Sequence, residues 1–123
     1  MRLFVAALFL FFMSANAFAQ TQPAVGEWYG VVDTHEGAFT VVVRITDSNG
    51  TLVGSLESVD QAPGQMIPLS AVQADNNSLS FLIPAIGASY QGEWSPATER
   101  WIGKFTQQSF VFTLELQRGT PPA

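Results

Sequence analysis

Apolar and polar side chains alternate along most of the chain after residue 25. A period of two is typical of a strand with one face in a core and the other in solvent, because successive side chains point to opposite faces of the pleat. The Asp-Ser-Asn-Gly sequence at 47–50 predicts a tight hairpin turn, since Asn and Gly tolerate positive φ. The clearest run puts Phe39, Val41, Val43 and Ile45 on one face and Thr40, Val42, Arg44 and Thr46 on the other.

Similar runs recur at a spacing of about 8–12 residues and predict about eight strands. Nearly every connection is short, which favours an antiparallel up-and-down meander. No helical i, i+3, i+4, i+7 pattern occurs after residue 19. A meander of this size pairs its edge strands most simply by closing, so we expect an all-β, lipocalin/avidin-like barrel. Such a barrel is just wide enough inside for side chains or for one small ligand.

Four glycines fall inside the predicted strands. Glycine there costs stability and often marks a bend or a close approach of two backbones. We interpret these positions as corners of the barrel. They are Gly30, Gly54, Gly92 and Gly103.

The connection over residues 58–65, Ser-Val-Asp-Gln-Ala-Pro-Gly-Gln, is longer than a minimal hairpin turn. Long loops often carry function, so its polar side chains are candidates for the rim of the barrel. The alternative is an Ω-like turn in which Asp60 bonds its own backbone, and the sequence leaves both open. After the loop, Pro68 indicates an edge strand or a bulge. The rim candidates are Ser58, Asp60, Gln61 and Gln65.

The first residues carry the pattern of an export signal. A positive Met-Arg end precedes an apolar run at 3–13, and small-x-small motifs follow at 15–19. The run is too short to span a bilayer, so we predict a signal peptide cleaved after Ala19, with an uncleaved anchor helix as the alternative. The protein is then exported, to a periplasm or the medium, without integral membrane association after cleavage. The predicted organisation is a signal peptide at 1–19, a lead at 20–25, a barrel at 26–117 and a flexible tail at 118–123.

The net charge limits the class of partner, and the cysteine content limits the source of stability. The chain has a formal net charge of −5 at pH 7, and loss of Arg2 with the signal peptide makes it one unit more negative. Without a basic stripe, we expect neither a nucleic acid nor an anionic lipid surface as partner. The chain contains no cysteine. Its stability therefore rests on one apolar core, for which about 100 residues suffice.

Residues that usually carry catalysis are sparse. The single histidine, His35, lies in a predicted turn, and we interpret it as a solvated side chain. We interpret Glu27, Glu57 and Glu93 as solvent-facing charges, with a glycosidase carboxylate pair as the alternative. The sequence has no His pair, calcium-type loop or Gly-rich phosphate loop. We therefore predict no catalytic residues, no metal and no cofactor.

Aromatic side chains gather in the phase assigned to the barrel interior, and they include all three tryptophans. Trp and Tyr rings stack on ligands, and their N–H or O–H groups donate hydrogen bonds. The alternative is that these side chains simply fill the barrel, which is the simpler interpretation for so small a fold. Phe105, Phe110 and Phe112 share this phase. The candidate ligand-binding residues are Trp28, Tyr90, Trp94 and Trp101.

The stretch 49–61, which ends in Asp-Gln and is followed by Ile67 and Pro68, has a specific pattern. It resembles the small lipocalin-like β domain that precedes the catalytic domain in some exported bacterial α/β-hydrolases. The resemblance implies an all-β domain of unassigned function, here standing alone without a hydrolase domain. The sequence departs from that pattern at Ala62 and at 107–109, where glycine is expected. The resemblance extends to residues 26–30, 84–92 and 110–116.

Three functions follow, in decreasing order of support. The first is an exported, non-enzymatic barrel that binds a small apolar or amphipathic ligand, with the aromatic candidates inside and Asp60 and Gln61 at the rim. The second is an interaction module that docks through the 58–65 loop onto another exported protein, such as a separately encoded hydrolase. The third is hydrolysis by the chain itself, for which the sequence offers no complete set of catalytic groups.

Overall fold

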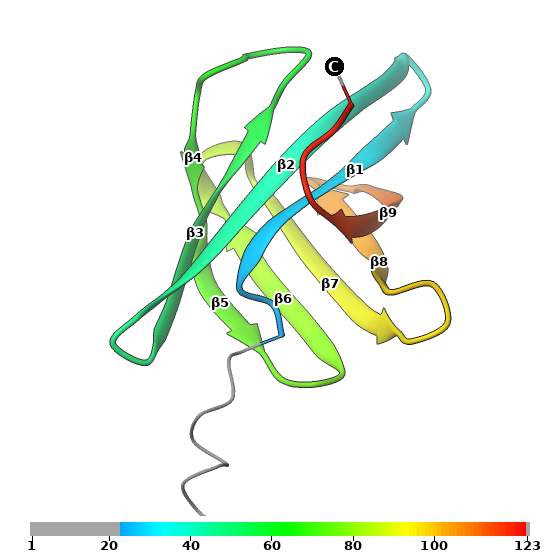
Figure 1. Ribbon diagram of the computed structural model, residues 1–123. Helices are drawn as coiled ribbons and strands as arrows, with labels where there is room; N and C mark the ends of the chain where they lie inside the picture. The colour runs from blue at the N-terminus through cyan, green and yellow to red at the C-terminus, as the bar shows by residue number, and fades with distance from the viewer. Residues whose placement is uncertain (1–22, 123) are drawn as a thin grey trace, which may run out of the picture.

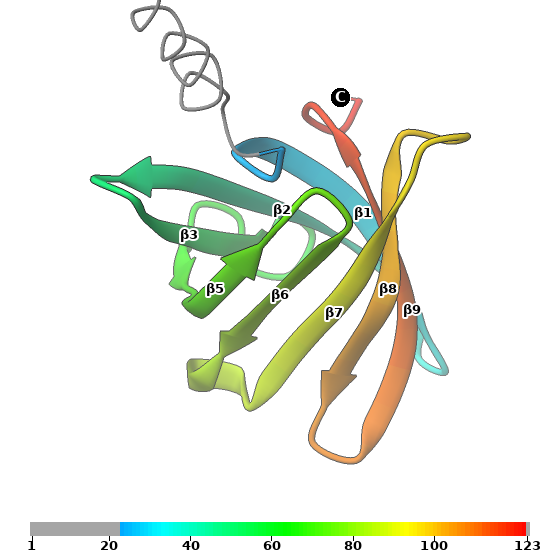
Figure 2. The same ribbon diagram turned by 90° about the horizontal axis from the view of Figure 1, so that it is seen from below.

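The computed structural model describes residues 23–122, and it is all-β apart from one 3-10 turn. The predicted signal peptide at 1–19 lies outside the described residues. Figure 1 shows the strands wrapped into a barrel, and Figure 2 shows the same barrel from below. No helix within the described part of the chain has the length and apolar character needed to cross a bilayer. The elements are β1 (Gly26–Thr34), β2 (Gly37–Ser48), β3 (Thr51–Ser58), β4 (Ile67–Pro68), β5 (Ser70–Ala74), β6 (Ser78–Ile83), η2 (Pro84–Ile86), β7 (Ala88–Ser95), β8 (Arg100–Gln107) and β9 (Phe110–Arg118).

The strands form one antiparallel sheet in the order β4-β3-β2-β1-β9-β8-β7-β6-β5. All pairings but one join strands that follow one another along the chain. The exception joins the first strand to the last, where Trp28 of β1 lies opposite Arg118 of β9. The predicted up-and-down meander is therefore confirmed, and its first and last strands pair with each other.

The two edges of the sheet, β4 and β5, belong to one continuous chain segment. β4 pairs with β3 and β5 pairs with β6, and between them the Leu69 amide donates to the Gly54 carbonyl at 2.9 Å. The segment passes from β3 to β6 between Leu69 and Ser70, since Ser70 already pairs with Leu82. A bulge follows between Ser70 and Gln73, where Ala71 has a φ of 52°. Residues 67–74 thus act as one kinked strand that nearly closes the barrel. This accounts for nine observed strands where about eight were predicted, and for the edge or bulge expected at Pro68.

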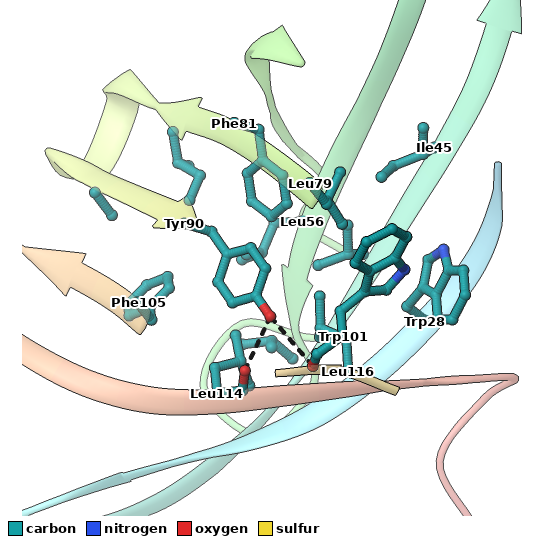
Figure 3. Close-up of a cluster of buried hydrophobic side chains, with 14 of the residues drawn as sticks. Trp28, Ile45, Leu56, Leu79, Phe81, Tyr90, Trp101, Phe105, Leu114 and Leu116 are labelled. Atoms are coloured by element: carbon teal, nitrogen blue, oxygen red, sulfur yellow. Dashed lines mark hydrogen bonds between the residues drawn. The ribbon is translucent and has the colours of Figure 1, made fainter. Parts of the chain in front are cut away.

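A continuous cluster of buried side chains occupies the interior (Figure 3). In β2 it takes Val41, Val43 and Ile45, which is the face that the alternation predicts. Val42 is also buried, although it lies in the outward phase opposite Glu57. Glu57 is covered from outside the barrel by the β3–β4 loop, whose Gly64 amide donates to its carboxylate.

The strand glycines let neighbouring backbones approach closely. A Cβ added at Gly30, Gly54 or Gly103 would meet a carbonyl oxygen of the adjacent strand. A Cβ at Gly92 would meet the ring of Tyr90, 2.8 Å from the nearest ring carbon. The expected close approach of two backbones is confirmed at Gly30, Gly54 and Gly103, whereas the neighbour at Gly92 is a side chain. A larger residue at any of the four displaces a neighbour.

The ends of the described segment are tied to the barrel. Ala24 is fully buried, and its carbonyl accepts the Trp28 indole N–H at 2.8 Å. Arg118 donates to two carbonyls of residues 23–25, each at 3.0 Å, and its guanidinium carbon lies 4.2 Å from the centroid of the Trp28 ring. The barrel therefore includes residues that the sequence analysis assigned to the lead and to the flexible tail.

Candidate functional site

The three tryptophans meet at one end of the barrel. Trp28 and Trp101 are fully buried, and Trp94 packs edge-on against them with ring centroids 6.1 and 5.1 Å away. Within residues 23–122 the Trp101 indole N–H has no conventional acceptor. It lies beside the Trp28 ring, which is steeply inclined to it at a centroid distance of 6.1 Å (Figure 3), and this arrangement suits an N–H···π contact. Mutually packed indoles thus close this end.

Tyr90 occupies the middle of the interior. Its ring stacks on Phe81 with centroids 5.3 Å apart. Its hydroxyl donates to the carbonyls of Leu114 at 3.0 Å and Trp101 at 3.3 Å, as the dashed lines of Figure 3 show. Burial, together with the nearby charge of Glu115, raises the pKa of the Tyr90 hydroxyl, so it remains a donor at neutral pH. The Tyr90 hydroxyl, which the sequence analysis considered as a donor to a ligand, is therefore hydrogen-bonded within the protein.

The opposite end of the barrel is open. A cavity of about 500 Å³ lies between the β1–β2 turn, the start of the β3–β4 loop and the β8–β9 turn, and we call it the mouth cavity. Its apolar wall consists of Phe39, Phe110 and Phe112. Phe39 and Phe112 also pack against the core, and the rings of Phe110 and Phe112 are nearly parallel with centroids 6.3 Å apart. The mouth cavity therefore has an aromatic wall that is continuous with the core.

Phe110 differs from its predicted position in the filled interior. It is 57% exposed, because β9 begins at this residue and the inward direction there faces the mouth cavity rather than packed side chains. Val111, the next residue, is 60% exposed and does not line the cavity. Two adjacent apolar residues of similar exposure thus differ in whether they face the cavity.

Polar side chains complete the rim. Asp60 and Gln61, two of the four rim candidates, line the cavity together with His35, Gln107 at the end of β8 and Gln108 in the β8–β9 turn. Ser58 is buried and donates to Gln61 Oε1 at 2.9 Å, and Gln65 is exposed farther along the loop. The sequence analysis missed this grouping, because turns far apart in the chain carry no local signal of their proximity.

The β3–β4 loop is fixed to the neighbouring strands as well as by its own turn bonds. At the rim, the Thr40 amide donates to Asp60 Oδ2 at 2.8 Å. On the outer wall, the Gly64 amide donates to Glu57 Oε2 at 2.8 Å. The alternative of an Ω-like turn assumed that Asp60 bonds its own loop, whereas the carboxylate reaches across to β2. The loop that supplies Asp60 and Gln61 to the mouth cavity is therefore anchored at two places.

Glu57 corrects the sequence analysis, which assigned it to solvent. It is only 8% exposed, because the loop folds over it. Its Oε1 accepts from Arg44 at 3.1 Å, and Arg44 Nε donates to Glu27 Oε2 at 2.7 Å. A carboxylate removed from water is costly unless it is paired, and Arg44 and the Gly64 amide provide that pairing. Glu93, by contrast, is exposed as expected.

We expect the loop anchor to weaken in acid. The Gly64 amide and, to a smaller extent, the Arg44 guanidinium hold the pKa of Glu57 below its ordinary value of 4.5. Because the folded-state pKa is the lower one, Glu57 stabilises the fold fully above pH 4.5. This contribution declines below that pH and is lost as the pH falls through the folded-state pKa. The Gly64 amide resonance in NMR spectra should therefore titrate with a midpoint below 4.5.

The matched variants for this titration are Glu57→Gln and Glu93→Gln, which each remove one carboxylate. Glu57→Gln should abolish the titration of the Gly64 amide, and Glu93→Gln should leave it unchanged. A titration that persists in Glu57→Gln, or a midpoint at or above 4.5, contradicts the assignment of this bond as the loop anchor.

Other parts of the described surface are weaker candidates for a binding site than the mouth cavity. A second hollow of about 550 Å³ lies on the outer face of β6 to β9 and is lined mainly by polar side chains, such as Gln91 and Lys104. The four aromatic candidates from the sequence line neither cavity. Among residues 23–122, no three His, Asp or Glu side chains are grouped so that they can hold a metal ion.

Comparisons with known proteins identify no relative. The chain matches no protein-family model, and no curated protein or solved structure matches it significantly. The resemblance to the lipocalin-like domain of exported hydrolases therefore stays a prediction.

Proposed function

We propose that this protein is an exported, non-enzymatic binding protein that takes a small amphipathic ligand in the mouth cavity. One observation carries the proposal, namely a cavity of about 500 Å³ whose wall is aromatic and whose rim is polar. Binding sites for small molecules are typically concave, largely apolar and about 300–1,000 Å³ in volume, with a few polar groups that orient the ligand. The mouth cavity has such a volume and an aromatic wall, and polar residues make up a larger share of its lining than in a typical site of this kind.

Phe110 gives the proposal an energetic argument. The fold leaves more than half of this residue in water, although its ring already stacks on Phe112. Covering a phenylalanine side chain completely is worth about 1.5–3 kcal/mol relative to full exposure. A ligand that lies against this wall removes Phe110 from water, and part of this burial energy then stabilises the complex.

We favour the mouth cavity over the tryptophan end for the same reason. Trp28, Tyr90 and Trp101 are already fully buried, so a ligand gains no further burial from them. The Trp28 N–H and the Tyr90 hydroxyl already have acceptors in the protein. A ligand among them displaces packed side chains, whereas a ligand at the mouth displaces only water.

Phe110→Ser and Val111→Ser form a matched pair that tests the proposal. Both remove an exposed apolar side chain from the start of β9, but only Phe110 lines the cavity. With the neutral fluorescent probe N-phenyl-naphthylamine, we expect Phe110→Ser to weaken binding about tenfold, which corresponds to about 1.4 kcal/mol. Val111→Ser should bind the probe like the unchanged protein.

Two outcomes contradict the proposal. One is absence of probe binding by the unchanged protein, and the other is equal binding by the two variants. Native mass spectrometry of the protein recovered from outside the cytoplasm adds a second test. A small extra mass lost on denaturation supports the proposal, and a chain that begins at Gln20 supports export. Recovery only with another protein attached favours the interaction module instead.

A further inference from the structure

The charged residues of the described chain are unevenly placed with respect to the mouth cavity. No arginine or lysine lines it. Arg44 and Arg100 are paired with glutamates on the outer wall, and Arg118 lies over Trp28 at the closed end. Lys104 is on the outer face of β8, 3.5 Å from the Thr113 hydroxyl. The positive charges of residues 23–122 are thus all away from the mouth.

Two carboxylates do line the mouth cavity, those of Glu36 and Asp60. Glu36 is exposed in the two-residue β1–β2 turn. Asp60 is held in place because its Oδ2 accepts the Thr40 amide at 2.8 Å, and within the described residues only this oxygen is engaged. Oδ1 of Asp60 therefore remains to accept a hydrogen bond from a ligand. The rim thus holds a fixed carboxylate whose negative charge no arginine or lysine of the described chain offsets, and His35 is the imidazole that lines the same cavity.

The wall of the cavity adds a second attraction for positive charge. The nearly parallel rings of Phe110 and Phe112 line the same cavity as these carboxylates. The face of an aromatic ring carries negative partial charge and attracts ammonium groups, and aromatic walls with few polar groups are the usual way to recognise quaternary ammonium ligands. Aromatic rings and carboxylates together therefore favour the same class of ligand.

We infer that the mouth cavity selects small organic cations, that is, amines or quaternary ammonium groups carried on an apolar body, over organic anions. The inference rests on the proposed function and names its ligand class. The apolar body lies against the phenylalanine wall, and the ammonium group lies at the rim beside Asp60 and Glu36. An anion of the same shape meets two like charges there, and its apolar body gains the same contacts, so charge alone decides between them.

Three probes with the same apolar body separate the effect of head-group charge from that of the apolar contacts. Phenylbutylamine, phenylbutanol and 5-phenylvalerate share the phenylbutyl body and carry a cationic, a neutral and an anionic head group, and isothermal titration calorimetry of the unchanged protein gives their affinities. We expect the amine to bind about tenfold tighter than the acid, with the alcohol between them. Added salt should narrow this difference, because screening acts on the exposed carboxylates and leaves the apolar contacts in place.

The variants Asp60→Asn and Glu36→Gln remove the rim charges and keep the size of the side chains. Asparagine retains an oxygen that accepts the Thr40 amide, so the loop keeps its anchor at the rim. Each variant should reduce the preference for the amine over the acid and change the affinity for the alcohol less than it changes the affinity for the amine. Glu93→Gln is the matched control, because it removes an exposed carboxylate on the outer face of β7 that does not line the mouth cavity.

The possible results separate this inference from the proposed function. If all three probes bind with similar affinity, or the acid binds tightest, the mouth cavity stands as a site and its cation selectivity is overturned. If none of the three probes binds, and Phe110→Ser does not change the affinity for N-phenyl-naphthylamine, the proposed function fails as well. A preference for the amine that Glu93→Gln reduces as much as Asp60→Asn also overturns the inference, because the effect then comes from net charge rather than from the rim.

Discussion

Replacing Trp28 by alanine is expected to lower the free energy of unfolding by about 3–5 kcal/mol, the range for truncating a large buried aromatic side chain. Trp28 is fully buried, and it contacts the rings of Trp94 and Trp101. Its N–H bonds the Ala24 carbonyl, and Arg118 covers its ring. Truncation therefore leaves a cavity and also removes one of the hydrogen bonds that hold residues 23–25 at this end of the barrel.

Urea denaturation followed by far-ultraviolet circular dichroism measures this loss, since removal of a tryptophan changes the fluorescence itself. Phe110→Ala is the control, because it truncates an aromatic residue that is 57% exposed, and it should cost less than about 1 kcal/mol. Trp28→Phe keeps most of the ring and loses the bond to Ala24, so we expect about 1–2 kcal/mol. A loss below about 1 kcal/mol in Trp28→Ala contradicts the central role of this side chain.

Replacing Gly103 by alanine is expected to destabilise the barrel by about 1–3 kcal/mol or more, as overpacking does. Gly103 of β8 lies opposite Gly92 of β7. A Cβ at Gly103 would meet the carbonyl oxygen of Gln91 and the Cα of Gly92, which are backbone atoms that no rotamer change moves away. The two strands must separate to admit one methyl group, and their hydrogen bonds lengthen as they do.

Lys104→Ala is the matched control for Gly103→Ala. Lys104 is the next residue on β8 and is exposed on the outer face, so its truncation should change stability by no more than about 0.5 kcal/mol. Thermal and urea unfolding of both variants give the comparison. If Gly103→Ala is as stable as Lys104→Ala, the close approach of β7 and β8 does not constrain this position.

We assign different roles to the two ends of the barrel, stability to the closed end and ligand binding to the mouth. At one end, packed indoles and the Arg118 bonds to residues 23–25 close the interior and supply burial energy. At the other end, Phe110 and the rim carboxylates are left in contact with water. Variants at the closed end should therefore change stability, and variants at the mouth should change binding with little effect on stability.

The fold class was predictable from the sequence because its signals are local. The alternation over 39–46 follows from the pleat of a single strand, and the turn at 47–50 follows from the backbone preferences of Asn and Gly. Short turns leave a meander as the simplest topology, and a meander needs closure to pair its edges. The pairing of β1 with β9 agrees with that reasoning. The glycines at which two backbones approach agree with it as well.

The sequence by itself thus determined an all-β meander and the inward face of its long strands. Only the tertiary structure decided that Glu57 is buried, that residues 67–74 form a kinked closing strand, and that the aromatic residues divide between a packed end and an open mouth. The physical reason is that these properties depend on which distant segments meet when the barrel closes. A period of two assigns each side chain to a face, but it does not say whether that face ends in packed neighbours, a covering loop or water.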